Sequence, residues 1–140
     1  MITVIKSPFV QYKLTILRNK KTSNTVFRQT MNEISYLIAS DVLQYVPFKK
    51  QTIETPLKKM SGTALGQPII LVPILRAGLG LLEGFAKFLP EAEKGHIGLY
   101  RDEQTYEPVE YLFKLPRVKN KKVLIPVSYT HLTLPTTAYV

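Results

Sequence analysis

The stretch Pro68-Ile-Ile-Leu-Val-Pro73, followed directly by Ile74-Leu-Arg-Ala-Gly-Leu-Gly80, decides the fold class of this 140-residue chain. The first part is a continuous apolar run, which is typical of a strand buried on both faces of a parallel sheet. The second part carries an arginine and two glycines, and apolar residues then recur at helical spacing until Pro90. A buried strand that leads into a helix predicts an α/β fold.

Two helices are expected before this strand. The segment from Pro8 to Leu17 has apolar residues three and four positions apart, with proline in the first turn. Thr22 or Ser23 then offers an N-cap for a long amphipathic helix. We expect that helix to run to about Leu43 and to stop before Pro47, since a residue that precedes proline avoids helical angles.

Further strands are expected on both sides of the central run. Gln51 to Pro56 alternates like a strand, and Lys58 to Gln67 is interpreted as a mostly polar turn. His96 to Tyr100 and Lys121 to Ile125 are interpreted as buried strands, and Glu107 to Phe113 as an extended arm that returns as a hairpin. The order predicts a mostly parallel sheet with flanking helices and a β-arm.

Bulk properties limit the function classes. The chain has no cysteine, which excludes a disulfide framework and cysteine-based metal sites. It shows no signal peptide, and the run from Pro68 to Gly80 is too short to span a bilayer, so we expect a cytoplasmic protein. The net charge of +9 favours anionic partners, but the basic groups, such as Lys114 to Lys122, are spread along the chain and do not select one ligand.

Arg76 is the first candidate for chemistry. It follows the buried strand, at the end where open parallel sheets bind ligands, and the next helix begins just after it. Gly78 and Gly80 lack Cβ atoms, so the backbone could approach a phosphate, and the helix N-terminus would present free N–H groups. The alternative is a tight turn whose glycines serve packing while Arg76 points to water, and the pattern alone leaves both open.

Arg101 is the second candidate, since it also sits where an apolar strand leaves the sheet. Taken alone, it is better interpreted as part of a solvated loop, paired with Asp102 or Glu103. Two arginines at the ends of two parallel strands, however, would line the same edge of one sheet. A multiply charged anion such as a sugar pyrophosphate would suit that edge.

The chain changes character from about Pro126 onward. Its last stretch, 127–140, has no charged residue except His131 and resembles the in-frame translation of a sequencing adapter. Ser128 and His131 have no acid partner and no glycine elbow, so we assign them no catalytic role. We therefore divide the chain into residues 1–125 and a non-native tail, 126–140.

Several blocks of sequence together resemble the uracil phosphoribosyltransferase family, over about residues 3 to 125. The blocks are Pro8-Phe-Val-Gln-Tyr-Lys-Leu-Thr-Ile-Leu-Arg18, Thr55-Pro56, Val72-Pro-Ile-Leu-Arg-Ala-Gly-Leu-Gly80, Gly95-His-Ile-Gly-Leu-Tyr-Arg-Asp102, Glu107-Pro-Val-Glu-Tyr111 and Lys114-Leu-Pro116. All of these blocks agree with the family in both order and spacing, and this combined agreement is more specific than any single motif. The resemblance implies part of a type I phosphoribosyltransferase fold.

The family makes uridine monophosphate and pyrophosphate from uracil and phosphoribosyl pyrophosphate, in pyrimidine salvage. The resemblance implies that Arg76, Ala77, Gly78 and Arg101 bind phosphoribosyl pyrophosphate, with a cis peptide between Arg76 and Ala77. It implies no catalytic side chain and no protein metal ligand here, because Mg²⁺ accompanies the pyrophosphate. It further implies GTP as an allosteric activator, a homo-oligomer, and a mobile flap from Asp102 to Lys114 beside the site.

The chain departs from the family after the strand that ends at Ile125. The family continues into an Asp-Pro segment and a Thr-Gly-Gly loop that holds the 5-phosphate, and then into the uracil-binding segment. None of these is in the sequence, so we expect this truncated polypeptide to be inactive and poorly stable. Three alternatives stay open: a nucleic-acid-binding regulator, a transferase for another base, and a structural fragment without a ligand. We expect neither nucleic acid nor membrane as a partner, since no recognition signature for nucleic acid is present.

Overall fold

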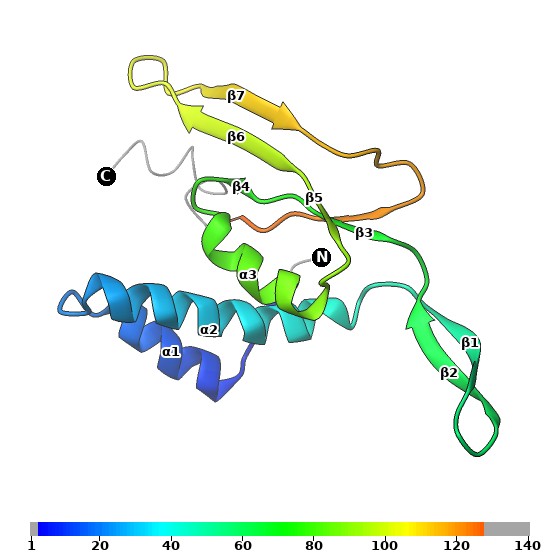
Figure 1. Cartoon of the computed structure of the whole chain (residues 1–140). Coiled ribbons are helices and arrows are strands. Elements are labelled where there is room, and N and C mark those ends of the chain that lie inside the picture. The colour runs from blue at the N-terminus through cyan, green and yellow to red at the C-terminus, as the bar shows by residue number, and fades with distance from the viewer. Residues whose placement is uncertain (1–2, 128–140) are drawn as a thin grey trace.

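The computed structural model of the chain describes residues 3–127. The helices are α1 (Pro8–Arg18), α2 (Asn24–Leu43) and α3 (Leu79–Phe88). The strands are β1 (Phe48–Glu54), β2 (Lys59–Leu65), β3 (Ile69–Leu71), β4 (Ile74–Leu75), β5 (Glu93–Lys94), β6 (His96–Arg101), β7 (Pro108–Lys114) and β8 (Lys122–Leu124). The elements form the mixed α/β fold that the sequence predicts (Figure 1).

The three helices begin and end close to their predicted positions. Pro8 opens α1, where its missing N–H costs no hydrogen bond. Ser23 is the N-cap of α2, and its hydroxyl oxygen accepts a hydrogen bond from the Val26 N–H at 3.4 Å. Local capping and proline chemistry thus explain why these boundaries can be predicted from sequence.

One sheet underlies the fold, although two short interruptions divide it. Ile70 pairs with Glu93, and Ile74 pairs with Ile97, so paired residues have the same sequence separation in both places. Strands β3 and β4 therefore continue one another along one line, β5 and β6 continue one another along the next, and the two lines run parallel. The Ile97 N–H bonds the Pro73 carbonyl across the interruption at 3.4 Å. The spatial order is β8, β3–β4, β5–β6 and β7, and only β7 is antiparallel. The mostly parallel sheet is confirmed.

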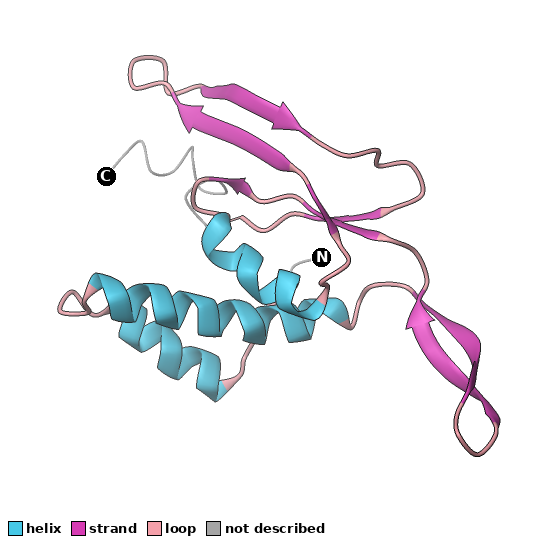
Figure 2. Cartoon of the chain, in the orientation of Figure 1, coloured by secondary structure: helices cyan, strands magenta, loops and turns pink. Residues whose placement is uncertain are grey.

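The core lies between β3 and the helices α2 and α3, which pack on one face of the sheet (Figure 2). Leu71 of β3 is fully buried there against apolar side chains from both helices. The buried members of this cluster are Ala39, Val46, Ile69, Leu71, Phe85 and Leu89. Burial of such side chains contributes about 1.5–3 kcal/mol each, so this cluster is what holds the strand in place beneath the arginine-bearing edge.

The interpretation of Lys58 to Gln67 as a polar turn is wrong. Residues Lys59–Leu65 form β2, which pairs with β1 in an antiparallel hairpin, with Ile53 opposite Met60. The hairpin projects away from the rest of the molecule (Figure 1), and no residue of either strand is buried. Because backbone pairing and not burial holds β2, its sequence carries little hydrophobic signal.

An ion pair joins α1 to α2, and it gives a prediction for acid pH. Lys13 Nζ lies 2.7 Å from a Glu33 carboxylate oxygen, and the Gln29 amide donates to the same carboxylate at 3.1 Å. These two hydrogen bonds, that of Lys13 first, lower the pKa of Glu33. A lowered folded-state pKa means that the stabilisation is complete above about pH 4.3 and is lost as the pH falls through the folded-state pKa.

We therefore expect the contact between α1 and α2 to loosen in acid, with a midpoint below pH 4.3. Glu33→Gln should remove this transition. NMR titration of the α1 amide shifts would measure it. An identical acid transition in the Gln variant would show that another group is responsible.

The predicted tail lies almost wholly outside the described residues. Pro126 is described, and its carbonyl accepts the Ile74 N–H at 3.1 Å beside β4. The division of the chain at residue 126 stays a prediction.

None of the helices that residues 3–127 form is long and apolar enough to cross a membrane.

Candidate functional site

The two predicted arginines lie at the same edge of the sheet. Strands β4 and β6 run parallel, with Leu75 paired to Gly98. Arg76 follows Leu75 directly, and Arg101 ends β6 three residues beyond Gly98. By this register, Arg76 is level with Leu99 of the neighbouring strand, about 4.8 Å away. Arg101 lies two residues beyond Leu99, about 7 Å further along the strand direction. The expectation that both arginines belong to one sheet edge is confirmed.

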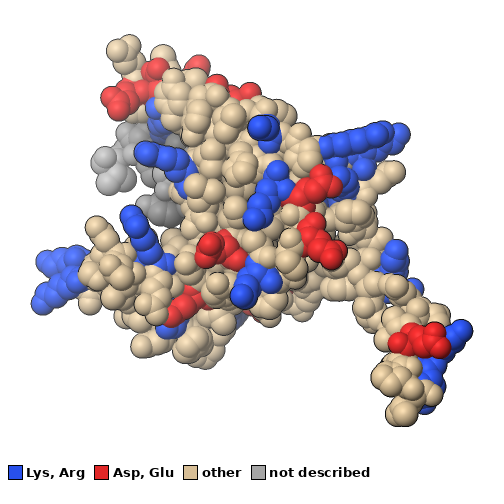
Figure 3. Space-filling model, in the orientation of Figure 1, with Lys and Arg blue, Asp and Glu red and all other residues tan. Residues whose placement is uncertain are grey.

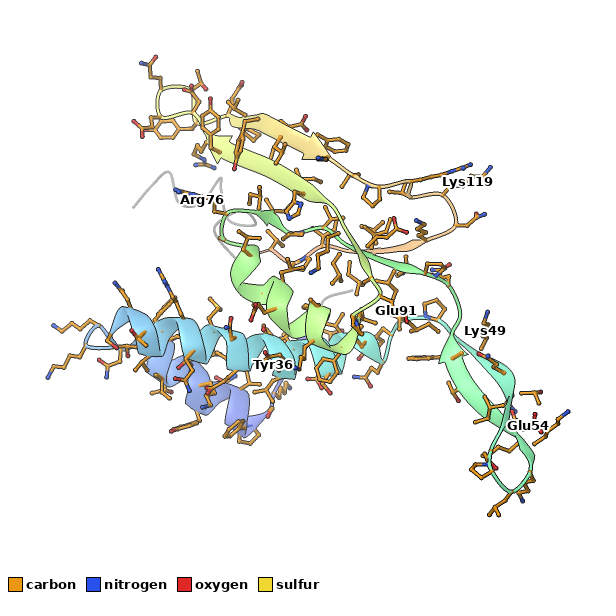
Figure 4. The ribbon with its side chains drawn as sticks, viewed as in Figure 1. Tyr36, Lys49, Glu54, Arg76, Glu91 and Lys119 are labelled. Carbon is orange, nitrogen blue, oxygen red and sulfur yellow. The ribbon has the colours of Figure 1, made fainter. Side chains whose placement is uncertain are left out.

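The two arginines differ in their surroundings. Arg76 and Ala77 are exposed, and Figure 4 shows Arg76 at the turn between β4 and α3. Arg101 is half-buried, and its Nε atom is buried without any hydrogen-bond partner among residues 3–127. A buried donor left unpaired costs about 1–3 kcal/mol, and such an atom calls for a partner from outside the described chain.

The glycines after Arg76 serve packing. A Cβ on Gly78 would lie 2.5 Å from the Pro126 carbonyl oxygen and 2.6 Å from that of Ile74. A Cβ on Gly80 would lie 3.2 Å from Met31 Cγ on α2. Both positions face protein, so these glycines let the turn approach its own neighbours. Of the two interpretations that the sequence leaves open for the glycines, the structure favours the tight turn.

The start of α3 is also less open to an anion than predicted. The Leu79 N–H donates to the Arg76 carbonyl at 3.1 Å, and the Gly80 N–H donates to that of Ala77 at 3.2 Å. The Gly78 N–H donates to the Ile74 carbonyl at 2.8 Å. The expectation of free N–H groups at this helix terminus is therefore wrong. What this turn still offers to an anion is the exposed Arg76 side chain and the positive end of the helix dipole.

The cis peptide expected from the resemblance is displaced by one residue. Within residues 3–127, the cis bond outside proline joins Leu75 to Arg76. The expected position, between Arg76 and Ala77, is wrong.

The predicted arm beside the site is the β6–β7 hairpin, in which Arg101 pairs with Pro108. A Cβ on Gly98 would lie 2.5 Å from Cζ of Tyr111, so the glycine makes room for that ring over the strand. Tyr111 in turn lies 6.1 Å from the Tyr100 ring, centroid to centroid. An aromatic pair thus packs across the two strands of the arm, next to Arg101.

Asp102 is a residue whose role the sequence reasoning missed. Its carboxylate accepts the N–H groups of Gln104 and Thr105, each at 2.8 Å, and closes the turn after β6. The sequence offers a signal for this, because an aspartate followed by polar residues at a strand end is typical of an Asx turn. The expected pairing of Arg101 with Asp102 or Glu103 is not formed; the ion pairs within residues 3–127 are Lys13–Glu33 and Lys121–Glu93.

Other features of the described residues lie away from the arginine edge. A cavity of about 440 Å³ opens at the opposite end of the sheet, lined in part by Lys49, Phe88 and Glu91 (Figure 4). Basic side chains gather at the α1–α2 turn and near the β7–β8 loop (Figure 3). Among residues 3–127, no three His, Cys, Asp or Glu side chains gather closely enough to hold a metal ion.

The geometry defines an α/β protein with two arginines at one edge of its sheet, and comparisons with known proteins give its family. The model of the family described as uracil phosphoribosyltransferase matches residues 4–129. A uracil phosphoribosyltransferase of Levilactobacillus brevis is 48% identical over 114 residues, which are 81% of this chain and 54% of that protein. One from Finegoldia magna is 46% identical over 127 residues, which are 90% of this chain and 61% of that protein.

A solved structure of an Aquifex aeolicus protein superposes with a TM-score of 0.84 at 30% sequence identity. It covers 99% of this chain and 68% of that one. The chain belongs to the uracil phosphoribosyltransferase family. It spans a little over half the length of the curated relatives that it matches.

Proposed function

We propose that this chain supplies the pyrophosphate-binding part of a uracil phosphoribosyltransferase. The complete protein would transfer the ribose 5-phosphate of phosphoribosyl pyrophosphate to uracil, which gives uridine monophosphate and pyrophosphate. One observation carries the proposal beyond family membership: Arg76 directly follows β4, Arg101 ends the adjacent parallel strand β6, and the buried Arg101 Nε has no partner within the described residues. We propose Arg76, Ala77, Gly78 and Arg101 as the residues at the phosphoribosyl pyrophosphate site.

The chemistry requires no nucleophile from these residues. When the bond from the ribose to the pyrophosphate breaks, negative charge grows on the departing oxygen. Fixed cationic donors aimed at that charge stabilise it more in the transition state than in the substrate. Arg76 at the turn after β4 and Arg101 at the end of β6 suit this role, because their forked donors match phosphate oxygens and adjacent strands bring them to one edge.

Magnesium would enter as the metal salt of the substrate, where it neutralises part of the pyrophosphate charge. The side chains near the arginines agree with this, because Asp102, the carboxylate next to Arg101 in the chain, is already occupied by two backbone N–H groups and is less available as a metal ligand. GTP activation and a cytoplasmic location remain expectations from the resemblance and the sequence.

We also propose that the complete protein is a homo-oligomer that uses the β1–β2 hairpin as a contact. The hairpin exposes apolar side chains far from the core, and Leu57 at its tip is 95% exposed. Phe48 and Ile53 of β1 are 53% and 42% exposed. An exposed apolar arm of this kind is typical of a surface that another chain covers.

The test uses the full-length protein, meaning a polypeptide that continues this chain to the length of its relatives. We expect it to form uridine monophosphate from uracil and phosphoribosyl pyrophosphate with Mg²⁺, and we expect no product from the 140-residue chain. Cytosine and hypoxanthine, offered in parallel, test the choice of base. Product from the short chain, or none from the full-length protein, would refute the proposal, and preference for another base would change the substrate.

A further inference from the structure

A tight turn separates the arginine at the end of β6 from the returning strand β7. The Asp102 carboxylate accepts the N–H groups of Gln104 and Thr105 at 2.8 Å. The Asp102 main chain closes the same turn from the other side, since its N–H donates to the Glu107 carbonyl and its carbonyl accepts the Tyr106 N–H, both at 3.0 Å. Asp102 therefore makes four hydrogen bonds within one turn.

The turn has a conformation that needs such support. Tyr106 has a φ of 58°, in the left-handed region that a bulky residue rarely adopts. The Thr105 hydroxyl oxygen accepts the Glu107 N–H at 3.3 Å, which adds one more bond around this residue. The N–H groups of Thr105 and Gln104, in that order of effect, lower the pKa of Asp102. The carboxylate is therefore ionised at neutral pH, and these bonds are charge-assisted.

This arrangement bears directly on Arg101. An arginine beside a carboxylate usually pairs with it, and paired charges are poorly available to a ligand. Here the carboxylate of the next residue, Asp102, is bound to the turn instead, and the Arg101 Nε has no partner among residues 3–127. The same turn fixes the backbone that immediately follows Arg101, because Asp102 bonds Glu107 across the hairpin.

We propose that Asp102 is a positioning residue: it closes the β6–β7 turn and thereby keeps Arg101 unpaired and correctly placed for the pyrophosphate group of the substrate. This inference rests on the proposed function, and it adds a role for a residue that does not touch the substrate. The role requires an oxygen acceptor at this position, and the negative charge only strengthens the hydrogen bonds that this acceptor makes. It therefore separates Asp102 from an acid–base or metal-binding residue.

The test is a series of variants at this position in the full-length protein. Asp102→Asn keeps an oxygen acceptor, Asp102→Ser keeps a weaker one, and Asp102→Ala has none. We expect the dissociation constant of phosphoribosyl pyrophosphate to stay within about threefold for the Asn variant and to rise about tenfold for the Ala variant, which corresponds to the loss of about one hydrogen bond. The Ser variant should lie between them, and kcat at saturating substrate should change much less.

Two controls accompany the series. Glu103→Gln removes the neighbouring exposed charge while leaving in place the hydrogen bonds by which Asp102 closes the turn, and it should leave the dissociation constant unchanged. Hydrogen exchange of the Gln104 and Thr105 amides should quicken in the Ala variant and not in the Asn variant. This readout reports the turn itself, separately from binding.

The outcomes distinguish this inference from the proposed function. If the wild-type protein does not bind phosphoribosyl pyrophosphate, both fail. If the wild type binds and the Ala variant binds equally well, the positioning role alone is overturned. If the Asn variant loses as much affinity as the Ala variant, the charge matters and the acceptor does not, which also overturns it. If the Ala variant does not fold, the Asn and Ser variants still give the comparison.

Discussion

Gly84→Ala is expected to lower the free energy of unfolding by about 3 kcal/mol, the upper part of the range for overpacked sites. Gly84 lies in the middle of α3, where that helix crosses α2. A Cβ at this position would overlap the backbone carbonyl of Ser35 and would lie 2.5 Å from its Oγ atom. Because the obstacle is the backbone of a packed helix, a rotamer change cannot relieve it.

Helix propensity alone predicts that Gly84→Ala raises the free energy of unfolding, so the sign of the measured change decides between propensity and the close contact. Alanine is favoured over glycine inside a helix by about 1 kcal/mol, so an unopposed substitution would stabilise α3. Gly80→Ala, one turn earlier in the same helix, is the matched control. Its Cβ would meet only the flexible Met31 side chain, at 3.2 Å, so we expect a change within about 1 kcal/mol in either direction.

Urea denaturation followed by circular dichroism would measure both variants. Ser35→Ala should not rescue Gly84→Ala, because the backbone atoms of residue 35 remain in place. Equal stability of the Gly84 and Gly80 variants would contradict the close helix contact. If the short chain is too unstable for denaturation curves, the full-length protein serves for the same comparison.

The fold could be predicted where local chemistry decides it. Ser23 marks a helix start by capping and Pro8 marks one as the first helical residue, while the apolar run from Pro68 to Pro73 marks the central strand by its continuity. Strand β2 could not be predicted in this way, because its residues are exposed and gain their order from pairing with β1. The two-residue strand β5 is also set by its neighbours, through the pairing of Ile70 with Glu93.

The candidate site shows the same division. Arg76 and Arg101 could be found from sequence, since each follows a recognisable strand and parallel strands end at one edge. The role of Gly78 could be found only in part: its Cβ is excluded by the nearby Ile74 carbonyl, within the tight turn that the sequence left open, and also by the carbonyl of Pro126, almost fifty residues later in the chain.

Arg76→Ala in the full-length protein is expected to raise the dissociation constant of phosphoribosyl pyrophosphate about 100-fold, the equivalent of one or two charged hydrogen bonds. Arg76 is exposed at the end of β4, so its guanidinium is available to an anion. Arg76→Lys keeps a point charge and loses the forked donors, so we expect an intermediate loss of about tenfold. Isothermal titration with phosphoribosyl pyrophosphate and with pyrophosphate alone would measure both variants.

The control for charge alone is Arg117→Ala, which removes an exposed arginine from the β7–β8 loop, away from this edge. It should leave the dissociation constant unchanged. Because Arg76 is exposed, its loss should also leave the melting temperature almost unchanged, so weakened binding cannot be attributed to unfolding. Loss of affinity for both phosphoribosyl pyrophosphate and pyrophosphate would assign Arg76 to the pyrophosphate group. Unchanged affinity in the Ala variant would instead favour the alternative in which Arg76 belongs to a solvated turn.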